Sequence, residues 1–95
     1  MSNLSIVLCT YNEAKNIKQT LIKLVNNNSV KEIIIIDDSS TDGTSDIIKS
    51  LNDNKIKLFV RKNTKGFASA FIFGIMMSQN DYILRFDIDM TDEIN

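Results

Sequence analysis

The chain has 95 residues, of which 43% are hydrophobic and 24% charged, and its formal net charge is −1. That length suits one small domain, which we expect over residues 1–95. The charges form no basic block, so nucleic acid is not an expected partner. With no histidine in the chain, histidine metal ligands and a Ser-His-Asp triad are excluded.

Targeting and redox signals point to an intracellular protein. No apolar run approaches the roughly 18 residues of a bilayer-spanning helix, so we expect no transmembrane segment. The first residues do not resemble a signal peptide. Cys9 is the single cysteine, so no disulfide can form within the chain. This suits a reducing compartment, and we expect the protein in the cytoplasm.

The first part of the sequence predicts a strand and a helix. Residues 4–9 are β-branched and mostly apolar, which is typical of a buried strand. After a short polar loop, a helix is predicted over residues 14–26, with Asn12 or Thr10 as its N-cap. The helix carries one apolar stripe, made of Ile17, Leu21, Leu24 and Val25.

A second strand and helix follow. The continuous apolar run of residues 33–36 favours a strand that is covered on both faces. It ends at Asp37 and Asp38. A polar turn then leads into a helix over residues 44–52, and we expect Asp42 to serve as a turn or capping residue there.

The last part predicts a strand over residues 56–60, a helix over 67–78 and a final strand from Tyr82. The final strand ends in two carboxylates, Asp87 and Asp89. Small side chains on the preceding helix would allow it to approach a sheet or a ligand closely. They are Ala68, Ser69, Ala70 and Gly74.

This alternation predicts an α/β fold, Rossmann-like, with a mostly parallel sheet between two helical layers and right-handed crossovers. Parallel strands end at one edge of the sheet, and ligands bind at that edge in open α/β sheets. Three polar clusters are therefore predicted to converge there. They are residues 10–13, residues 37–38 and the pair Asp87 and Asp89.

The Asp-x-Asp pair predicts a metal site. Two carboxylates this close repel each other unless a cation lies between them. Mg²⁺ or Mn²⁺ takes oxygen ligands and leaves positions open for phosphate oxygens. We therefore expect Asp87 and Asp89 to form a metal–diphosphate site. The alternative interpretation is a pair of acids in a surface turn.

Together these motifs resemble those of the family 2 glycosyltransferases of GT-A fold. The matching segments are residues 9–13 (CTYNE), 36–44 (IDDSSTDGT), 65–70 (KGFASA) with Gly74, and 81–89 (DYILRFDID). Within the family, the chain looks most like the dolichol-phosphate mannosyltransferase branch, which glycosylates polyprenyl phosphates. The resemblance covers nearly the whole chain and implies the N-terminal half of a GT-A domain.

The resemblance also implies roles for individual residues. Tyr11 and Glu13 would line the nucleotide pocket, and Asp38 would accept a hydrogen bond from the base. Asp87 and Asp89 would hold Mg²⁺ or Mn²⁺ on the diphosphate of a UDP- or GDP-linked sugar. The full implied set of nucleotide-binding residues is Thr10, Tyr11, Glu13, Asp37, Asp38 and Asp87.

Other expectations concern the reaction as a whole. The family's catalytic base lies beyond the Asp-x-Asp, so we expect no catalytic residue within residues 1–95 and no turnover by the isolated chain. The implied acceptor is a polyprenyl phosphate, which would place the protein at the cytoplasmic face of a membrane.

Two alternatives stay open at this stage. One is a phospho-receiver signalling domain, whose acidic pocket would be formed by Asp37, Asp38 and Asp87. The other is a non-catalytic chain that self-associates into a homo-oligomer through an exposed sheet edge.

Overall fold

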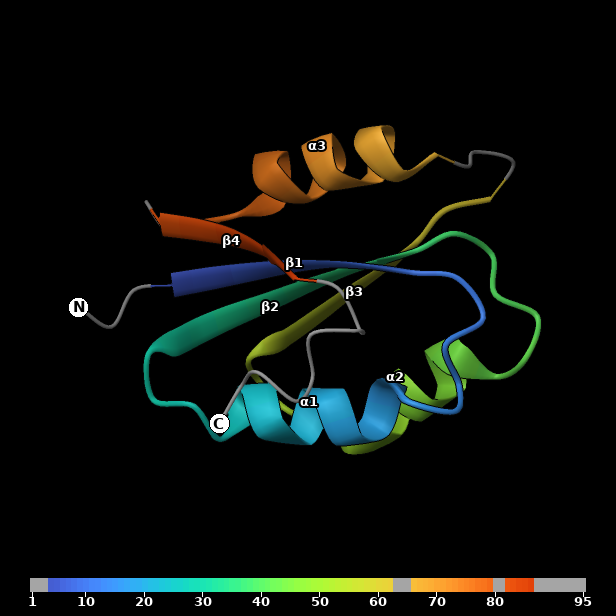
Figure 1. Ribbon diagram of the computed structural model, residues 1–95, viewed down its shortest axis with the longest axis horizontal. Coiled ribbons are helices and arrows are strands. Elements are labelled where there is room, and N and C mark those ends of the chain that lie inside the picture. Colours follow the sequence, from blue (N-terminus) through green and yellow to red (C-terminus); the bar gives the residue numbers. More distant parts are fainter. Residues whose placement is uncertain (1–3, 63–65, 80–81, 87–95) are drawn as a thin grey trace.

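The computed structural model describes residues 4–62, 66–79 and 82–86 (Figure 1). Its helices and strands alternate as the sequence predicts, and the strands form one parallel sheet in the order β3-β2-β1-β4. The predicted α/β class is therefore confirmed. The elements are β1 (Leu4–Thr10), α1 (Ile17–Val25), β2 (Val30–Asp37), α2 (Thr44–Leu51), β3 (Ile56–Val60), α3 (Phe67–Met77) and β4 (Tyr82–Phe86).

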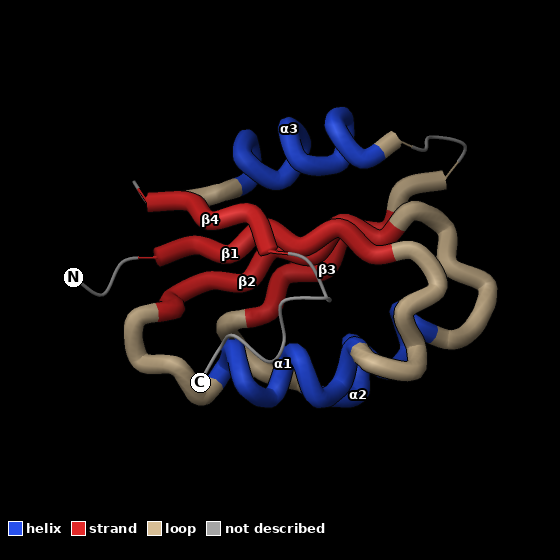
Figure 2. The backbone as a smooth tube through the Cα atoms, viewed as in Figure 1, coloured by secondary structure: helices blue, strands red, loops and turns tan. Residues whose placement is uncertain are grey.

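The helices lie on both faces of this sheet. α1 and α2 cover one face and α3 covers the other (Figures 1 and 2). The chain runs from β1 through β2 to β3 in one direction, then crosses back to place β4 beside β1. Right-handed crossovers place helices on opposite faces when the direction reverses. The reversal lies between β1 and β4, and such switch points are where open α/β sheets bind ligands.

The strand order also corrects one alternative interpretation. In the flavodoxin-like order of receiver domains, the first strand lies between the second and third. Here β1 lies between β2 and β4. The receiver interpretation is therefore wrong.

The buried core explains the apolar run of β2. Ile33 and Ile35 pack with residues of β1, α1 and α2, whereas Ile34 and Ile36 pack with Ala70 of α3. All four isoleucines are fully buried. Since successive strand residues point to opposite faces, a strand covered on both sides needs an apolar residue at every position.

Two boundaries differ from the prediction by three residues, and the others up to the start of β4 by no more than one. α1 begins at Ile17 rather than Ala14, because the N–H groups of Asn16 and Ile17 both donate to the Glu13 carbonyl in an irregular turn. Asn16 is the N-cap residue and makes no side-chain cap bond, so the capping role predicted for Asn12 or Thr10 is wrong. β2 begins at Val30, three residues before the predicted run, because it pairs with β1 from Leu4 onward.

The start of β2 does not show in the hydrophobicity pattern because it contains Glu32. This acidic residue is nevertheless buried, with 3% exposure. It accepts hydrogen bonds from the Ser5 hydroxyl at 2.7 Å, the Lys57 ammonium at 2.6 Å and the Gln79 N–H at 3.1 Å. Burial by itself raises the pKa of Glu32. The bonds from Lys57, Ser5 and Gln79 outweigh it, so the pKa lies below the ordinary value of 4.5.

We expect Glu32→Gln to lower the free energy of unfolding by about 1–2 kcal/mol at neutral pH, because it removes a charged acceptor from three donors. A lowered pKa stabilises the fold above the unfolded-state pKa, and this contribution is lost as pH falls through the folded-state value. The difference between the two proteins should therefore shrink below the ordinary pKa of 4.5. Urea unfolding across this pH range measures it. Asp46→Asn, which alters an exposed acid, is the control; an equal effect there would contradict the prediction.

None of the helices in the described part of the chain reaches the length and apolarity that a bilayer span requires.

Candidate functional site

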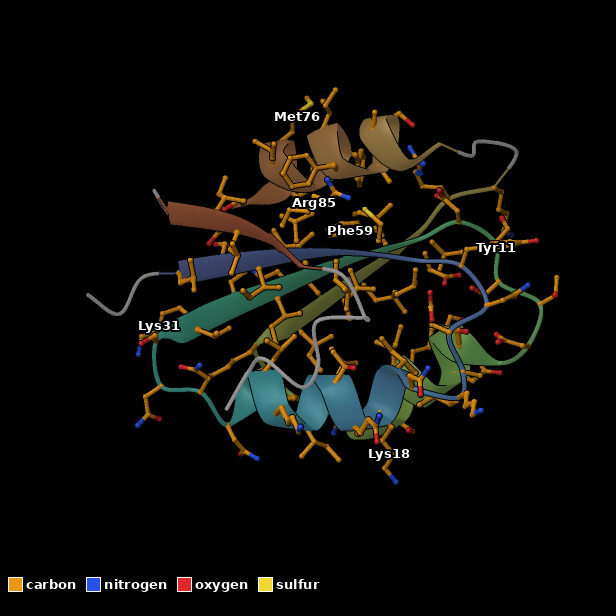
Figure 3. The ribbon with its side chains drawn as sticks, in the orientation of Figure 1. Tyr11, Lys18, Lys31, Phe59, Met76 and Arg85 are labelled. Carbon is orange, nitrogen blue, oxygen red and sulfur yellow. The ribbon has the colours of Figure 1, made fainter. Side chains whose placement is uncertain are left out.

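The predicted site lies at the carboxyl edge of the sheet, where the loops after β1 and β2 meet. Figure 3 places Tyr11 at this edge and Lys31 at the opposite end of the sheet. Tyr11 is 49% exposed although it directly follows the buried Thr10. An aromatic ring in this position presents a face on which a flat ligand group can stack.

Asp37 is the buried centre of this edge. It is 1% exposed, and its Oδ1 accepts hydrogen bonds from the hydroxyls of Thr10 and Ser40, both at 2.6 Å. Its Oδ2 accepts the Ser40 N–H at 3.0 Å. A buried carboxylate needs such donors to offset its desolvation. Asp37 thereby fixes the end of β1 to the turn after β2.

The two loops are joined a second time through Asn12. Its N–H donates to the Ser40 hydroxyl at 2.8 Å, and its side-chain carbonyl accepts the Thr41 N–H at 2.8 Å. Asn12 adopts a left-handed backbone with φ of 55°, which asparagine tolerates better than most residues. The two loops therefore form one hydrogen-bonded unit.

Asp42 and Thr44 make a third connection. Asp42 accepts the N–H of Ala14 at 3.0 Å and that of Thr44 at 3.1 Å, while the Thr44 hydroxyl accepts the Glu13 N–H at 3.0 Å. The Thr44 hydroxyl also donates to Asp42 and is the main cause of a lowered pKa of that carboxyl. The turn role predicted for Asp42 is confirmed by its bond from the Thr44 N–H, whereas the N-cap residue of α2 is Gly43.

Asp38 forms an ion pair with Arg61. Arg61 Nε lies 2.7 Å from Asp38 Oδ1, and Nη2 lies 2.9 Å from Oδ2. The two side chains keep 12% and 13% of their exposure, respectively. The hydrogen bond to Asp38 raises the pKa of Arg61, so the guanidinium stays charged. Arg61 also donates to the Gly66 carbonyl at 3.2 Å and to the Ser69 hydroxyl at 3.1 Å.

Arg61 is the residue that sequence reasoning missed. The signal was its place directly after β3: Val60 pairs with Asp37, so the next residue on each strand, Arg61 and Asp38, lies at the same level. Without the strand order, nothing identified β2 and β3 as neighbours.

The structure brings five of the predicted residues to one edge: Thr10, Tyr11, Glu13, Asp37 and Asp38. Asp87 and Asp89 lie outside the described residues. β4 runs parallel to β1 and ends at Phe86, opposite Leu8, so its carboxyl end faces this same edge.

The described acids at this edge do not suit a metal by themselves. Within residues 4–62, 66–79 and 82–86, no group of three or more acidic or thiol ligands is arranged to hold an ion. Asp37 is engaged by hydroxyls and Asp38 by a guanidinium. Hard cations take oxygen ligands, and the metal site predicted at Asp87 and Asp89 stays a prediction.

Comparison with known proteins identifies relatives. The chain is 34% identical over 91 residues to poly-beta-1,6-N-acetyl-D-glucosamine synthase of Staphylococcus aureus, covering 94% of this chain and 22% of that protein. The chain thus spans about a fifth of the length of this curated relative.

Solved structures share the fold. A mannosyltransferase from Pyrobaculum calidifontis, in complex with GDP-Man and Mn²⁺, superposes with a TM-score of 0.76 at 22% identity, over 92% of this chain and 27% of that one. Glucosyl-3-phosphoglycerate synthase from Mycobacterium tuberculosis, in complex with Mn²⁺ and UDP, gives 0.75 at 19% identity, over 90% of this chain and 33% of that one. Both likenesses agree with the predicted GT-A fold.

The family itself follows from residues 5–95, which match the family described as Glycosyl transferase family 2. That segment contains the loops joined by Asp37 and the Asp-x-Asp sequence. The chain belongs to glycosyl transferase family 2.

Proposed function

We propose that this chain forms the donor-binding part of a glycosyltransferase that moves a sugar from a UDP- or GDP-linked donor to an acceptor. The observation that carries this proposal is Asp38, a carboxylate held by Arg61 at the carboxyl edge of the sheet. The Asp38 N–H donates to the carbonyl of Thr10, the residue before the exposed Tyr11. A carboxylate accepts the ring N–H of uracil or guanine, and an aromatic ring stacks on either base.

The supporting residues act on the shape of the site. Asp37 and Thr10 are buried and bonded to each other, so in this proposal they hold the loops that present Tyr11 and Asp38. Direct contact of Asp37, Thr10 or Glu13 with nucleotide stays a prediction. Tyr11 and Asp38 would therefore recognise the base, whereas Asp37 and Thr10 would keep the two loops rigid.

Asp87 and Asp89 would hold Mg²⁺ or Mn²⁺ in this scheme. When bound, the ion would neutralise charge that builds on the leaving diphosphate. The two solved relatives described above were determined with Mn²⁺, which supports a divalent ion without distinguishing it from Mg²⁺.

Two features of the comparison bear on the acceptor. The resemblance to dolichol-phosphate mannosyltransferases implies a polyprenyl phosphate at the cytoplasmic face of a membrane. The Staphylococcus aureus relative is named for a polysaccharide instead. We expect the isolated chain to bind donor nucleotide weakly and to show no sugar transfer.

Calorimetric titration with UDP and GDP, with and without Mn²⁺, tests the donor site. We expect binding of at least one nucleotide that strengthens with Mn²⁺. Asp89→Ala should remove the metal dependence. Asp38→Asn should weaken binding by about tenfold or more, because it removes a charged hydrogen-bond acceptor.

Asp46→Asn, an exposed acid on α2, serves as the control for both variants and should bind like the wild type. Thermal unfolding of each variant separates loss of binding from loss of fold. Unchanged nucleotide affinity in a folded Asp38→Asn protein would contradict the proposed role of Asp38 in binding the base.

A further inference from the structure

The pairing of Arg61 with Asp38 has a directional geometry. Arg61 uses Nε and Nη2, one on each carboxylate oxygen, at 2.7 and 2.9 Å. This is the side-on arrangement of two parallel N–H···O bonds. These two hydrogen bonds occupy the two lone pairs of Asp38 that point in the same direction, one on each oxygen.

A carboxylate has about four lone-pair positions, so two remain. These two point away from each other, on the outer sides of the oxygens. Each oxygen of Asp38 therefore keeps one acceptor position for a single donor. It cannot place two parallel donors on both oxygens at once unless Arg61 leaves.

Arg61 is held against leaving. Beyond Asp38, its guanidinium donates to the Gly66 carbonyl and to the Ser69 hydroxyl, both at the start of α3. The ion pair is mostly buried, with 12% exposure of the Asp38 side chain. Displacing Arg61 would break charge-assisted hydrogen bonds in a poorly solvated place.

Uracil and guanine differ in the donors that they present to a carboxylate. Guanine offers two parallel donors, the ring N1–H and the exocyclic amino group, whereas uracil offers only the ring N3–H. We propose that Arg61 makes this site select uracil over guanine by occupying the paired acceptor positions of Asp38, so that the donor is a UDP-linked sugar. The inference rests on the proposed function, because it requires that Asp38 faces the base.

Titration of the ¹⁵N-labelled chain with UDP, GDP and inosine diphosphate, followed by NMR shifts, tests this selection and detects weak binding. We expect UDP to bind at least about tenfold more tightly than GDP, since the guanine amino group would be buried without an acceptor. Inosine diphosphate lacks that amino group and keeps the ring N–H, so it should also bind more tightly than GDP. This comparison needs no variant.

Arg61→Lys tests the residue itself. Lysine keeps the positive charge, but its ammonium cannot donate two parallel hydrogen bonds as a guanidinium does. One of the paired acceptor positions on Asp38 therefore becomes available to a ligand. The preference for UDP over GDP should fall to about threefold or less. Ser69→Ala is the matched control, because it removes a partner of Arg61 and leaves the ion pair with Asp38 in place; the preference should not change.

Each result decides the inference. GDP binding as tightly as UDP or inosine diphosphate in the wild type would overturn it, while loss of that binding in Asp38→Asn would leave the proposed function standing. An unchanged preference in folded Arg61→Lys would also overturn the role of Arg61. No shifts with any nucleotide would overturn the inference and the proposed function together.

Discussion

Replacing Asp37 with alanine is expected to lower the free energy of unfolding by about 3 kcal/mol, a large share of the stability of a small domain. The carboxylate accepts three hydrogen bonds, from the Thr10 hydroxyl and from both the hydroxyl and the N–H of Ser40. Alanine would leave these donors in a site that is 1% exposed in the native protein. Unsatisfied buried donors each cost on the order of 1–3 kcal/mol.

The same substitution should loosen the site. Ser40 is the residue that accepts the Asn12 N–H, so loss of Asp37 weakens this connection between the two loops, while those through Thr41 and Asp42 remain. In hydrogen exchange, the N–H groups of Asn12 and Thr41 should lose protection before the rest of the sheet does. Nucleotide binding should weaken although Asp37 itself is buried.

Three variants that remove increasing parts of this hydrogen-bond network should lower the free energy of unfolding by increasing amounts. Thr10→Val removes one of the three bonds and should cost about 1 kcal/mol, and Asp37→Asn, which keeps one acceptor oxygen, should fall between that and alanine. Denaturant unfolding of all three proteins gives the comparison. A loss of less than about 1 kcal/mol in Asp37→Ala would mean that the hydroxyls find other partners.

Much of the fold was predictable because its signals are local. The apolar run of residues 33–36 predicted a strand covered on both faces, and α1 and α3 indeed lie on opposite sides of it. The alternation of helices and strands then predicted a parallel sheet. The strand order was not predictable in this way, because it depends on which strands pair at long range.

The site shows the same division. Asp38 and Tyr11 were identified from their place after predicted strands. Arg61 was missed because its pairing with Asp38 depends on β3 lying beside β2. The capping role of Asn12 failed for a related reason: its side chain bonds to Thr41, a residue 29 positions away, which local capping rules do not consider.

Gly74→Val is expected to destabilise the protein by about 3 kcal/mol, because α3 lies directly on β1 at this residue. A Cβ atom at position 74 would overlap the Cγ1 methyl of Val7, a fully buried strand residue. Gly74 lies in α3 and the short Val7 side chain lies in β1, so we expect α3 to move away from the sheet to relieve the overlap. The predicted close approach of the small residues in this helix is thus confirmed at Gly74.

The matched test measures the effect of Gly74→Ala on the free energy of unfolding in two backgrounds, where we expect it to have opposite signs. In an ordinary helix position, glycine to alanine stabilises by about 1 kcal/mol. Here Gly74→Ala should destabilise, because the overlap with Val7 outweighs the helix propensity. In a Val7→Ala background the overlapping methyl is gone, and the same Gly74→Ala change should become stabilising. A double-mutant cycle by urea unfolding measures this coupling. If Gly74→Ala stabilises both backgrounds equally, α3 is free to shift, and the contact with Val7 does not set its distance from the sheet.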